Sequence, residues 1–173
     1  YFPKFDWPRI VNPKIRFPLN DENMQRVSDL EQQSINQIKD SIIENPDDIA
    51  AIILEPIQGE GGDNHFRDEF MTSLRHICDE NEMMFIMDEV QTGIGITGKW
   101  WAHEHFSTKP DIIAFGKKAQ VCGMLASSRV DEVEQNVFAE SSRINSTFGG
   151  NLTDMVRFQL ILEIITNENL LEN

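Results

Sequence analysis

The chain has 173 residues, of which 40% are hydrophobic and 25% are charged, a composition that argues against disorder. Acidic residues outnumber basic ones by 29 to 15, and the resulting net charge of −14 argues against binding to nucleic acids or to anionic membrane surfaces. No apolar run of the sequence approaches the roughly 20 residues that a membrane-spanning helix needs. The two cysteines, Cys78 and Cys122, cannot form a disulfide framework, so we expect a cytoplasmic protein.

The first part of the chain, residues 1–27, holds most of the seven prolines and follows neither a helical nor an alternating pattern. We therefore expect residues 1–27 to be an extended connection and residues 28–173 to form the folded part. A compact domain seldom begins with so long a stretch lacking regular structure. This leads us to expect that the sequence is an interior piece of a longer chain.

Beyond residue 27 the pattern alternates between helices and strands. Ser28 and Glu31 have capping-box spacing, and the isoleucines that follow recur at helical intervals up to about residue 45, which predicts a helix. Further elements are predicted as a helix around residues 66–77, a short helix at 100–106, a possible strand at 121–127 and a long helix at 152–165.

Three continuous apolar runs, at 50–54, 83–87 and 112–115, are typical of strands buried on both faces. Their alternation with helices predicts an α/β fold with a mainly parallel sheet and flanking helices. Each run is followed by polar residues, which include Glu55, Asp88 and Lys117. Because the carboxyl ends of parallel strands meet at one edge, where such sheets bind ligands, we expect these side chains to form a site.

Two other motifs invite different functions and fit them poorly. The string GIGITG at 93–98 has the spacing of a dinucleotide-binding turn, but no long helix begins inside it, so we interpret it as a glycine-rich turn. His103 and His105 would point about 200° apart on a helix, which makes a shared metal ion unfavourable. We therefore expect no metal site.

Asp88 and Lys117 gain significance as a pair. Alone, each has an ordinary interpretation, Asp88 as a cap of the following turn and Lys117 as a solvated surface lysine. At the ends of neighbouring strands, they match what pyridoxal phosphate requires, which is an amine for its aldehyde and a carboxylate for its protonated ring nitrogen.

Four strings carry a resemblance to a known family, namely EPIQGEGG at 55–62, DEVQTG at 88–93, PDIIAFGKK at 110–118 and NSTFGGN at 145–151. Together they resemble the class III aminotransferases, pyridoxal-phosphate enzymes of fold type I. The resemblance covers nearly the whole chain. It implies that the chain is the central part of the large cofactor-binding domain, with the phosphate loop, the ring-stacking aromatic residue, the carboxylate-binding arginine and the small domain lying outside it.

The resemblance also implies roles for residues that follow the strands. Lys117 would hold the cofactor, with Lys118 as a charged neighbour, and Asp88 would pair with the ring nitrogen. Val90 would pack on the ring face, and Gln91 would contact the cofactor's 3-oxygen and lie near the substrate.

Four further positions receive roles from the same resemblance. Thr147 would reach the cofactor phosphate of the neighbouring subunit, which implies a homodimer with shared active sites. Glu60 would pair with the carboxylate-binding arginine and move away when a dicarboxylate binds. Glu55 and Asn145 would support the site from behind the residues that touch the cofactor.

Within the family, EGGDNHFRDEF and AFGKKAQVCG look most like enzymes whose donor is the terminal amine of L-lysine, with 2-oxoglutarate as acceptor. Enzymes that use 4-aminobutyrate or another ω-amino acid are the second choice. A non-catalytic homologue that serves as a binding partner is the alternative of a different class, but it would have no need for Lys117 and Asp88 together.

Overall fold

The computed structural model describes residues 5–144 and 149–172. Its centre is a four-stranded sheet in the order β1 (Ala51–Leu54), β4 (Met84–Asp88), β5 (Ile112–Phe115) and β6 (Gly123–Ala126). The first three strands are parallel, and β6 is antiparallel to β5. The predicted α/β fold with a mainly parallel sheet is confirmed, and the strands lie where the apolar runs placed them.

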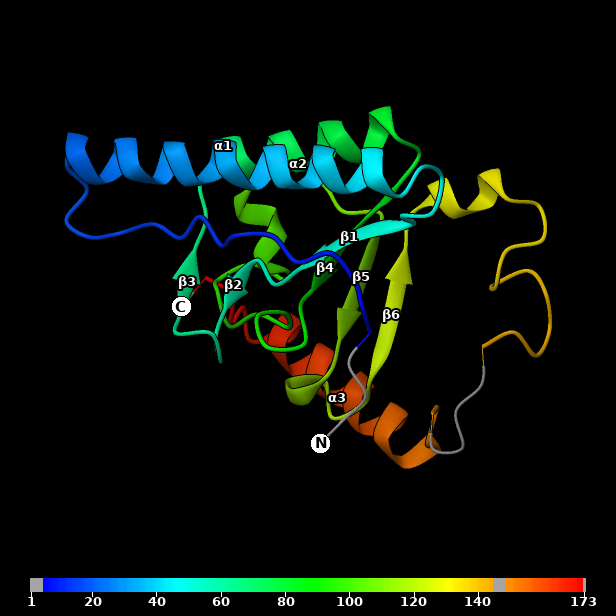
Figure 1. Cartoon of the computed structure of the whole chain (residues 1–173). Coiled ribbons are helices and arrows are strands. Elements are labelled where there is room, and N and C mark those ends of the chain that lie inside the picture. The colour runs from blue at the N-terminus through cyan, green and yellow to red at the C-terminus, as the bar shows by residue number, and fades with distance from the viewer. Residues whose placement is uncertain (1–4, 145–148, 173) are drawn as a thin grey trace.

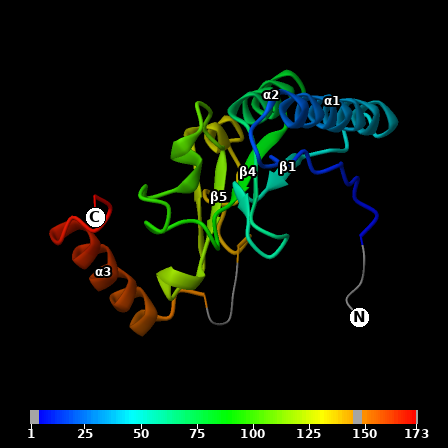
Figure 2. The ribbon, with the colours of Figure 1, turned by 90° about the vertical axis from the view of Figure 1, so that its left-hand side faces the viewer.

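Helices lie on both sides of this sheet (Figures 1 and 2). On one side, α1 (Asp21–Glu44) runs beside α2 (Asp68–Glu80). On the other side lies α3 (Leu152–Asn167), which contacts the sheet where Phe158 stacks on Phe115 of β5 at a centroid distance of 5.8 Å. Short 3₁₀ helices lie at Ala102–His105, Lys117–Ala119 and Ser128–Glu132.

The helix predicted to begin at Ser28 begins seven residues earlier, so the boundary placed at residue 27 is wrong. Asn20 caps α1, since its side-chain oxygen accepts a hydrogen bond from the backbone N–H of Asn23 at 2.9 Å. Asp21 in the first turn adds a favourable charge at the positive end of the helix dipole. Glu31 does not complete a capping box, because it forms a buried ion pair with Arg67.

The extended segment before α1 lies against folded structure. Its residue Val11 donates from its backbone N–H to the side chain of Gln37 at 2.7 Å and accepts from the hydroxyl of Ser34 at 2.5 Å. Ile15 donates its backbone N–H to the carbonyl of His65 at 2.8 Å. The segment therefore links α1 to a small hairpin that the sequence analysis did not anticipate, formed by β2 (Ile57–Gln58) and β3 (Asn64–His65).

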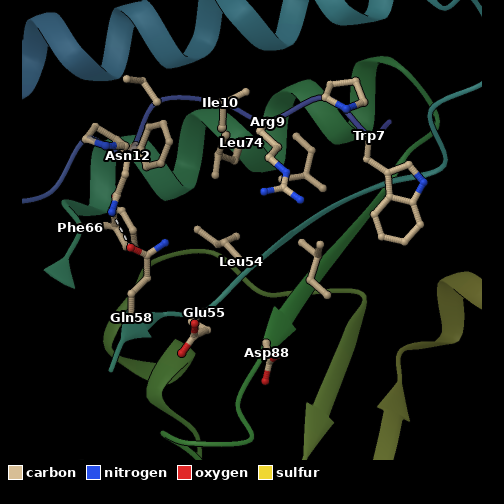
Figure 3. A pocket seen from close by; sticks show the side chains of 16 residues that line it. Trp7, Arg9, Ile10, Asn12, Leu54, Glu55, Gln58, Phe66, Leu74 and Asp88 are labelled. Carbon is tan, nitrogen blue, oxygen red and sulfur yellow. Dashed lines mark hydrogen bonds between the residues drawn. The ribbon is translucent and has the colours of Figure 1, made fainter. Parts of the chain in front are cut away.

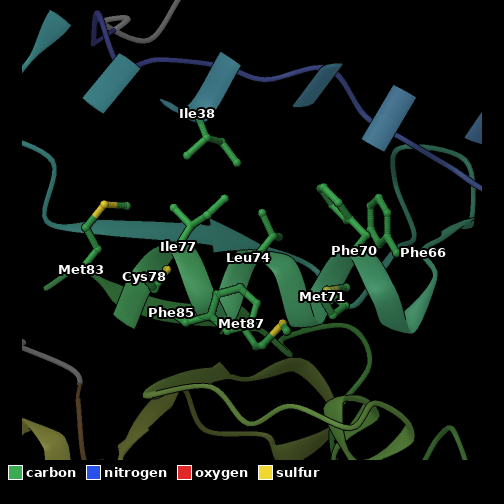
Figure 4. Close-up of a cluster of buried hydrophobic side chains, with 10 residues drawn as sticks. All are labelled: Ile38, Phe66, Phe70, Met71, Leu74, Ile77, Cys78, Met83, Phe85 and Met87. Carbon is green, nitrogen blue, oxygen red and sulfur yellow. The ribbon is translucent and has the colours of Figure 1, made fainter. Parts of the chain in front are cut away.

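The hydrophobic core lies between α2 and the sheet (Figure 4). The apolar face of α2 is buried because its residues recur at helical spacing, and alternate residues of β4 point toward it. The core side chains are Ile38, Phe66, Phe70, Met71, Leu74, Ile77, Cys78, Met83, Phe85 and Met87.

An ion network ties α2 to the far end of the sheet. Buried Asp111, just before β5, accepts hydrogen bonds from Arg75 at 2.7 Å, from Arg129 at 3.1 Å and from the backbone N–H of Phe85 at 2.8 Å. Three donors compensate the burial of this carboxylate. They also align the start of β5 with β4, and so help set where both strands end.

The expectation that the strands are buried on both faces is wrong for β1. This strand is at the edge of the sheet, and Ile53 is 62% exposed. In the described part of the chain, α3 also leaves an apolar stripe in solvent, made by Leu152, Val156, Leu160 and Ile164. None of the described helices combines the length and the apolar character needed to cross a membrane.

Candidate active site

Asp88 lies at the carboxyl edge of the sheet, where β4 ends and a turn begins. Asp88 is the last residue of β4 and pairs in register with Ala114 of β5. Its Oδ1 accepts a hydrogen bond from the backbone N–H of Val90 at 3.1 Å, which is the turn cap expected of a strand-end acid. The backbone N–H of Glu89 bonds the carbonyl of Ala114 at 2.8 Å, so the turn begins firmly attached to the neighbouring strand.

Lys117 lies two residues beyond the end of β5, at the same edge. It follows buried Gly116, begins a 3₁₀ turn, and has an exposed side chain. Its backbone φ of 48° is in the left-handed region, which costs a non-glycine residue on the order of 1 kcal/mol. The carbonyl of Lys117 accepts from the backbone N–H of Gln120 at 2.9 Å, which closes the turn and stabilises this conformation.

The two turns are in direct contact. The ammonium group of Lys118 donates a hydrogen bond to the backbone carbonyl of Gln91. A side chain built on Gly116 would lie 3.6 Å from a methyl group of Val90, so Val90 packs beside the residue that precedes Lys117. Partial burial and the neighbouring charge of Lys117 lower the pKa of Lys118, while Glu89 acts against them.

Glu89 organises this site, although the sequence analysis gave it no role. Its buried carboxylate accepts from the Thr92 hydroxyl at 2.6 Å and from the backbone N–H groups of Ala102 and His103 at 2.9 and 2.8 Å. The His103 ring nitrogen Nδ1 lies 3.1 Å away. Burial alone would raise the pKa of Glu89, but these bonds together hold it below its usual value. In the sequence, the only sign of this role is weak: Glu89 follows Asp88 directly, and a threonine comes three residues later.

The glycine-rich loop after β2 meets the same turn at Gln91. The Gln91 side chain fills the space beside Gly59, where an added methyl group would lie 1.8 Å from its amide oxygen. That oxygen is buried, and among the described residues it has no hydrogen-bond donor. Three turns therefore meet here, namely the β2–β3 loop, the turn after β4 and the turn after β5.

A cavity of about 460 Å³ opens beside β1, with Glu55 and Asp88 in its wall (Figure 3). Trp7 and Arg9 of the extended N-terminal segment form the opposite side. Lys117 is not among the lining residues, because it follows β5, on the other side of β4 from this cavity. Glu55 and Asp88 thus face a common space, whereas Lys117 follows the neighbouring strand β5.

Three predicted site residues remain, Glu60, Thr147 and Asn145. Glu60 is exposed in the loop between β2 and β3, and in the described part of the chain it has no ion-pair partner. Thr147 and Asn145 lie outside the described residues.

The two histidines have protein partners rather than a common ligand. His103 contacts Glu89, and Nε2 of His105 lies 3.0 Å from the carbonyl of Thr97. Over residues 5–144 and 149–172, no group of three or more His, Cys, Asp or Glu side chains is arranged to hold a metal ion.

Gly93, the first glycine of the GIGITG string, packs directly against the Trp101 ring. A methyl group added at Gly93 would lie 2.8 Å from two ring carbons.

Comparison with known proteins relates this chain to one enzyme family. The family model described as aminotransferase class III matches residues 3–173. The L-lysine-epsilon aminotransferase of Mycobacterium tuberculosis is 54% identical over 171 residues, which is 99% of this chain and 37% of that protein. The human mitochondrial 4-aminobutyrate aminotransferase is 36% identical over 179 residues, which is 99% of this chain and 34% of the relative.

Solved structures agree with the sequence comparison. The fold is similar to that of lysine aminotransferase from M. tuberculosis in the internal aldimine form, with a TM-score of 0.93 at 54% sequence identity. That match covers 99% of this chain and 39% of the solved chain. The chain therefore spans between a third and two fifths of the length of these relatives.

Proposed function

Because the chain belongs to the class III aminotransferases, we propose that it provides the cofactor-binding centre of an L-lysine 6-aminotransferase. The reaction would transfer the terminal amino group of L-lysine to 2-oxoglutarate, with 2-aminoadipate 6-semialdehyde and L-glutamate as products. The observation that carries the proposal is the contact between the turn that bears Asp88 and the turn that bears Lys117, at the ends of adjacent parallel strands.

The residues at this edge fit pyridoxal phosphate. In the described part of the chain, the amine of Lys117 is exposed and unpaired, and only one oxygen of Asp88 has a hydrogen-bond donor. The buried oxygen of Gln91 is also free. An amine, a carboxylate oxygen and an amide, all without partners and all at one edge, match a planar cofactor with an aldehyde at one end and a ring nitrogen elsewhere.

Pyridoxal phosphate, when bound, supplies an aldehyde carbon that takes up amines and a ring that accepts an electron pair from the neighbouring carbon. The chain's own residues would do the rest. Lys117 would hold the cofactor between turnovers and, once displaced by the substrate amine, would move a proton at the carbon that bears nitrogen. Asp88 would keep the ring nitrogen protonated through its negative charge, and Val90 would limit the room beside the ring.

Lysine is favoured over 4-aminobutyrate as the donor because the lysine enzymes are 45–54% identical over 95–99% of this chain, whereas two 4-aminobutyrate enzymes are 46% identical over 70% of it and 36% identical over 99% of it. Both reactions require one site to accept a monocarboxylate donor and a dicarboxylate acceptor. We assign Glu60 the part of masking the acceptor-binding arginine in the first half-reaction, since it is exposed in a glycine-rich loop that leaves it room to move. A binding-only role is disfavoured because Asp88 and Lys117 are both present.

We also propose a cytoplasmic homodimer in which Thr147 contacts the cofactor of the partner subunit and Asn145 supports that loop. The support is the family membership, together with two cysteines that are both free. Full-length subunits inactivated at Lys117 can be mixed with subunits inactivated at Thr147. Recovery of activity in the mixture is expected, because one site per mixed dimer then has both residues intact. If activity stays absent after subunit exchange is verified, the shared site is rejected.

The substrate proposal is tested by single-turnover reaction of the full-length holoenzyme with L-lysine, 4-aminobutyrate, L-ornithine and L-glutamate. L-Lysine is expected to react fastest, as followed by the loss of the cofactor's absorption near 420 nm. Faster reaction with 4-aminobutyrate would assign the protein to the second function. In Glu60→Ala, L-glutamate is expected to gain relative to L-lysine, whereas an equal loss with all donors would make Glu60 a structural residue.

A further inference from the structure

Gln91 is held in place from its backbone. Its carbonyl oxygen accepts a hydrogen bond from the ammonium group of Lys118. The preceding residues of the same turn are fixed as well, since the N–H of Val90 bonds Asp88 and the N–H of Gly93 bonds the carbonyl of Glu89 at 2.8 Å. The position from which the Gln91 side chain extends is therefore set by the two strands β4 and β5.

Gly59 is fixed just as firmly on the opposite side. Its carbonyl accepts from the N–H groups of Gly62 and Asp63 at 3.0 and 3.3 Å, which closes a tight turn between β2 and β3. The hairpin is anchored in turn by Gln58, whose side-chain oxygen accepts from Asn12 at 2.5 Å and from Asn64 at 3.1 Å. Neither Gly59 nor the backbone of Gln91 can move far without breaking these bonds.

Between these two fixed backbones, the Gln91 amide occupies the space that a side chain at position 59 would need. A methyl group on Gly59 would lie 1.8 Å from the amide oxygen and 2.6 Å from the amide carbon, well inside van der Waals contact. The backbone of Gly59 does not have a positive φ, so the conformation itself does not demand glycine. The demand comes from the side chain of Gln91.

We propose that Gly59 is a positioning residue of the active site, whose missing side chain fixes the rotamer of the Gln91 amide beside the Asp88 and Lys117 turns. This inference rests on the proposed function. The amide oxygen is buried against Gly59 and has no donor among the described residues, so the space at Gly59 holds the amide in one orientation at this edge of the sheet.

The test is a double-mutant cycle in the full-length protein with Gly59→Ala, Gln91→Ala and both together. Each single change is expected to lower kcat/KM by a similar factor, on the order of 10²-fold, because a displaced polar group costs about that much. In the double variant the loss should equal that of Gln91→Ala alone. Glu134→Ala, at an exposed position outside this loop, is the control and should change kcat/KM less than twofold.

Two readouts separate positioning from mere structural support. The pH titration of the bound cofactor's absorption should shift equally in Gly59→Ala, in Gln91→Ala and in the double variant. In the apoprotein, Gly59→Ala should lower Tm, and the added Gln91→Ala should restore it, because removal of the amide removes the clash. This second readout needs no cofactor and also covers the case in which Gly59→Ala folds poorly.

Additive losses in the cycle, or a lowered Tm that Gln91→Ala does not restore, would overturn the positioning role of Gly59. An unshifted cofactor titration in Gly59→Ala would do the same. A wild-type protein that fails to hold the cofactor on Lys117 would instead overturn the proposed function, so the two failures are distinguishable.

Discussion

At the scale of single residues, the site depends on carboxylates whose surroundings differ. Asp88 is half-buried, and one of its oxygens accepts a hydrogen bond from the backbone N–H of Val90, so the other oxygen remains for a ligand. Its neighbour Glu89 is buried, and both of its oxygens accept hydrogen bonds from residues between Thr92 and His103. Adjacent acids in one motif therefore differ in their bonding, since one keeps a free oxygen and the other uses both oxygens within the protein.

Asp88→Asn in the full-length enzyme should retain the fold and lose most of its turnover. A neutral amide cannot stabilise a positive ring nitrogen, and the loss of that ion pair should slow the reaction on the order of 10³-fold. The comparison of kcat with the thermal stability of the same variant checks this. An unchanged kcat would show that Asp88 serves only as the cap of its turn.

Glu89→Gln should destabilise the protein at neutral pH by about 2 kcal/mol, because an amide cannot accept all the bonds that the carboxylate accepts. The folded-state pKa of Glu89 is lowered, so the carboxylate stabilises the fold above its ordinary value of 4.5, and this stabilisation is lost as pH falls through the lower, folded-state pKa. The stability difference between wild type and variant should therefore shrink below about pH 4.5.

Urea unfolding at pH 7 and pH 4 measures this effect, with Glu134→Gln as an exposed control. A stability difference that is independent of pH would mean that Glu89 contributes through packing and not through its charge.

At the scale of elements, the sequence predicted the strands of the central sheet well, because continuous apolar runs are distinctive. It also predicted which strand ends would meet, since parallel strands present their carboxyl ends at one edge. The start of α1 was missed because Asn20 outcompetes the Ser28 capping-box signal. The contacts of Gln91 with Gly59 and Lys118 were missed because they join segments far apart in the sequence, and no local pattern encodes them.

The GIGITG string has the spacing of a dinucleotide-binding turn, but packing explains its first glycine. Gly93 is needed where the Trp101 ring and the carbonyl of Glu89 approach it, at 2.8 and 2.9 Å from an added methyl group. Trp101 in turn lies against Phe115 of β5, with ring centroids 5.8 Å apart. The motif thus packs a turn onto the sheet rather than cradling a dinucleotide.

Gly93→Ala should destabilise the full-length protein by about 1–3 kcal/mol, because the added methyl group must push aside an aromatic ring and a backbone carbonyl. Chemical denaturation compares it with Gly61→Ala, where the nearest atom would lie farther from the added methyl group, at 3.3 Å. Equal stability of the two variants would show that the Trp101 packing is not tight. The addition of a dinucleotide should not change the Tm of either protein.

At the scale of the whole molecule, apolar surface and net charge oppose each other. Leu152, Val156, Leu160 and Ile164 leave an apolar stripe along α3, and Ile53 of β1 is exposed at the sheet edge. A contiguous apolar surface favours association, whereas a net charge of −14 opposes it. The balance between them depends on ionic strength.

A polypeptide limited to these 173 residues should therefore bind an apolar dye and associate increasingly as salt screens its charge. Size-exclusion chromatography at low and high sodium chloride measures this, and replacement of Leu160 and Ile164 by serine should reduce it. A monomer at every salt concentration, without dye binding, would show that the stripe on α3 has no such effect.

The central claim is that Lys117, and not its neighbour Lys118, holds the cofactor. Lys117 is exposed, whereas Lys118 is committed to the carbonyl of Gln91. The most direct measurement is borohydride reduction of the full-length holoenzyme followed by peptide mass spectrometry. A pyridoxyl group on Lys117, absent in Lys117→Ala, is the predicted result, and an adduct on Lys118 or on neither lysine would contradict it.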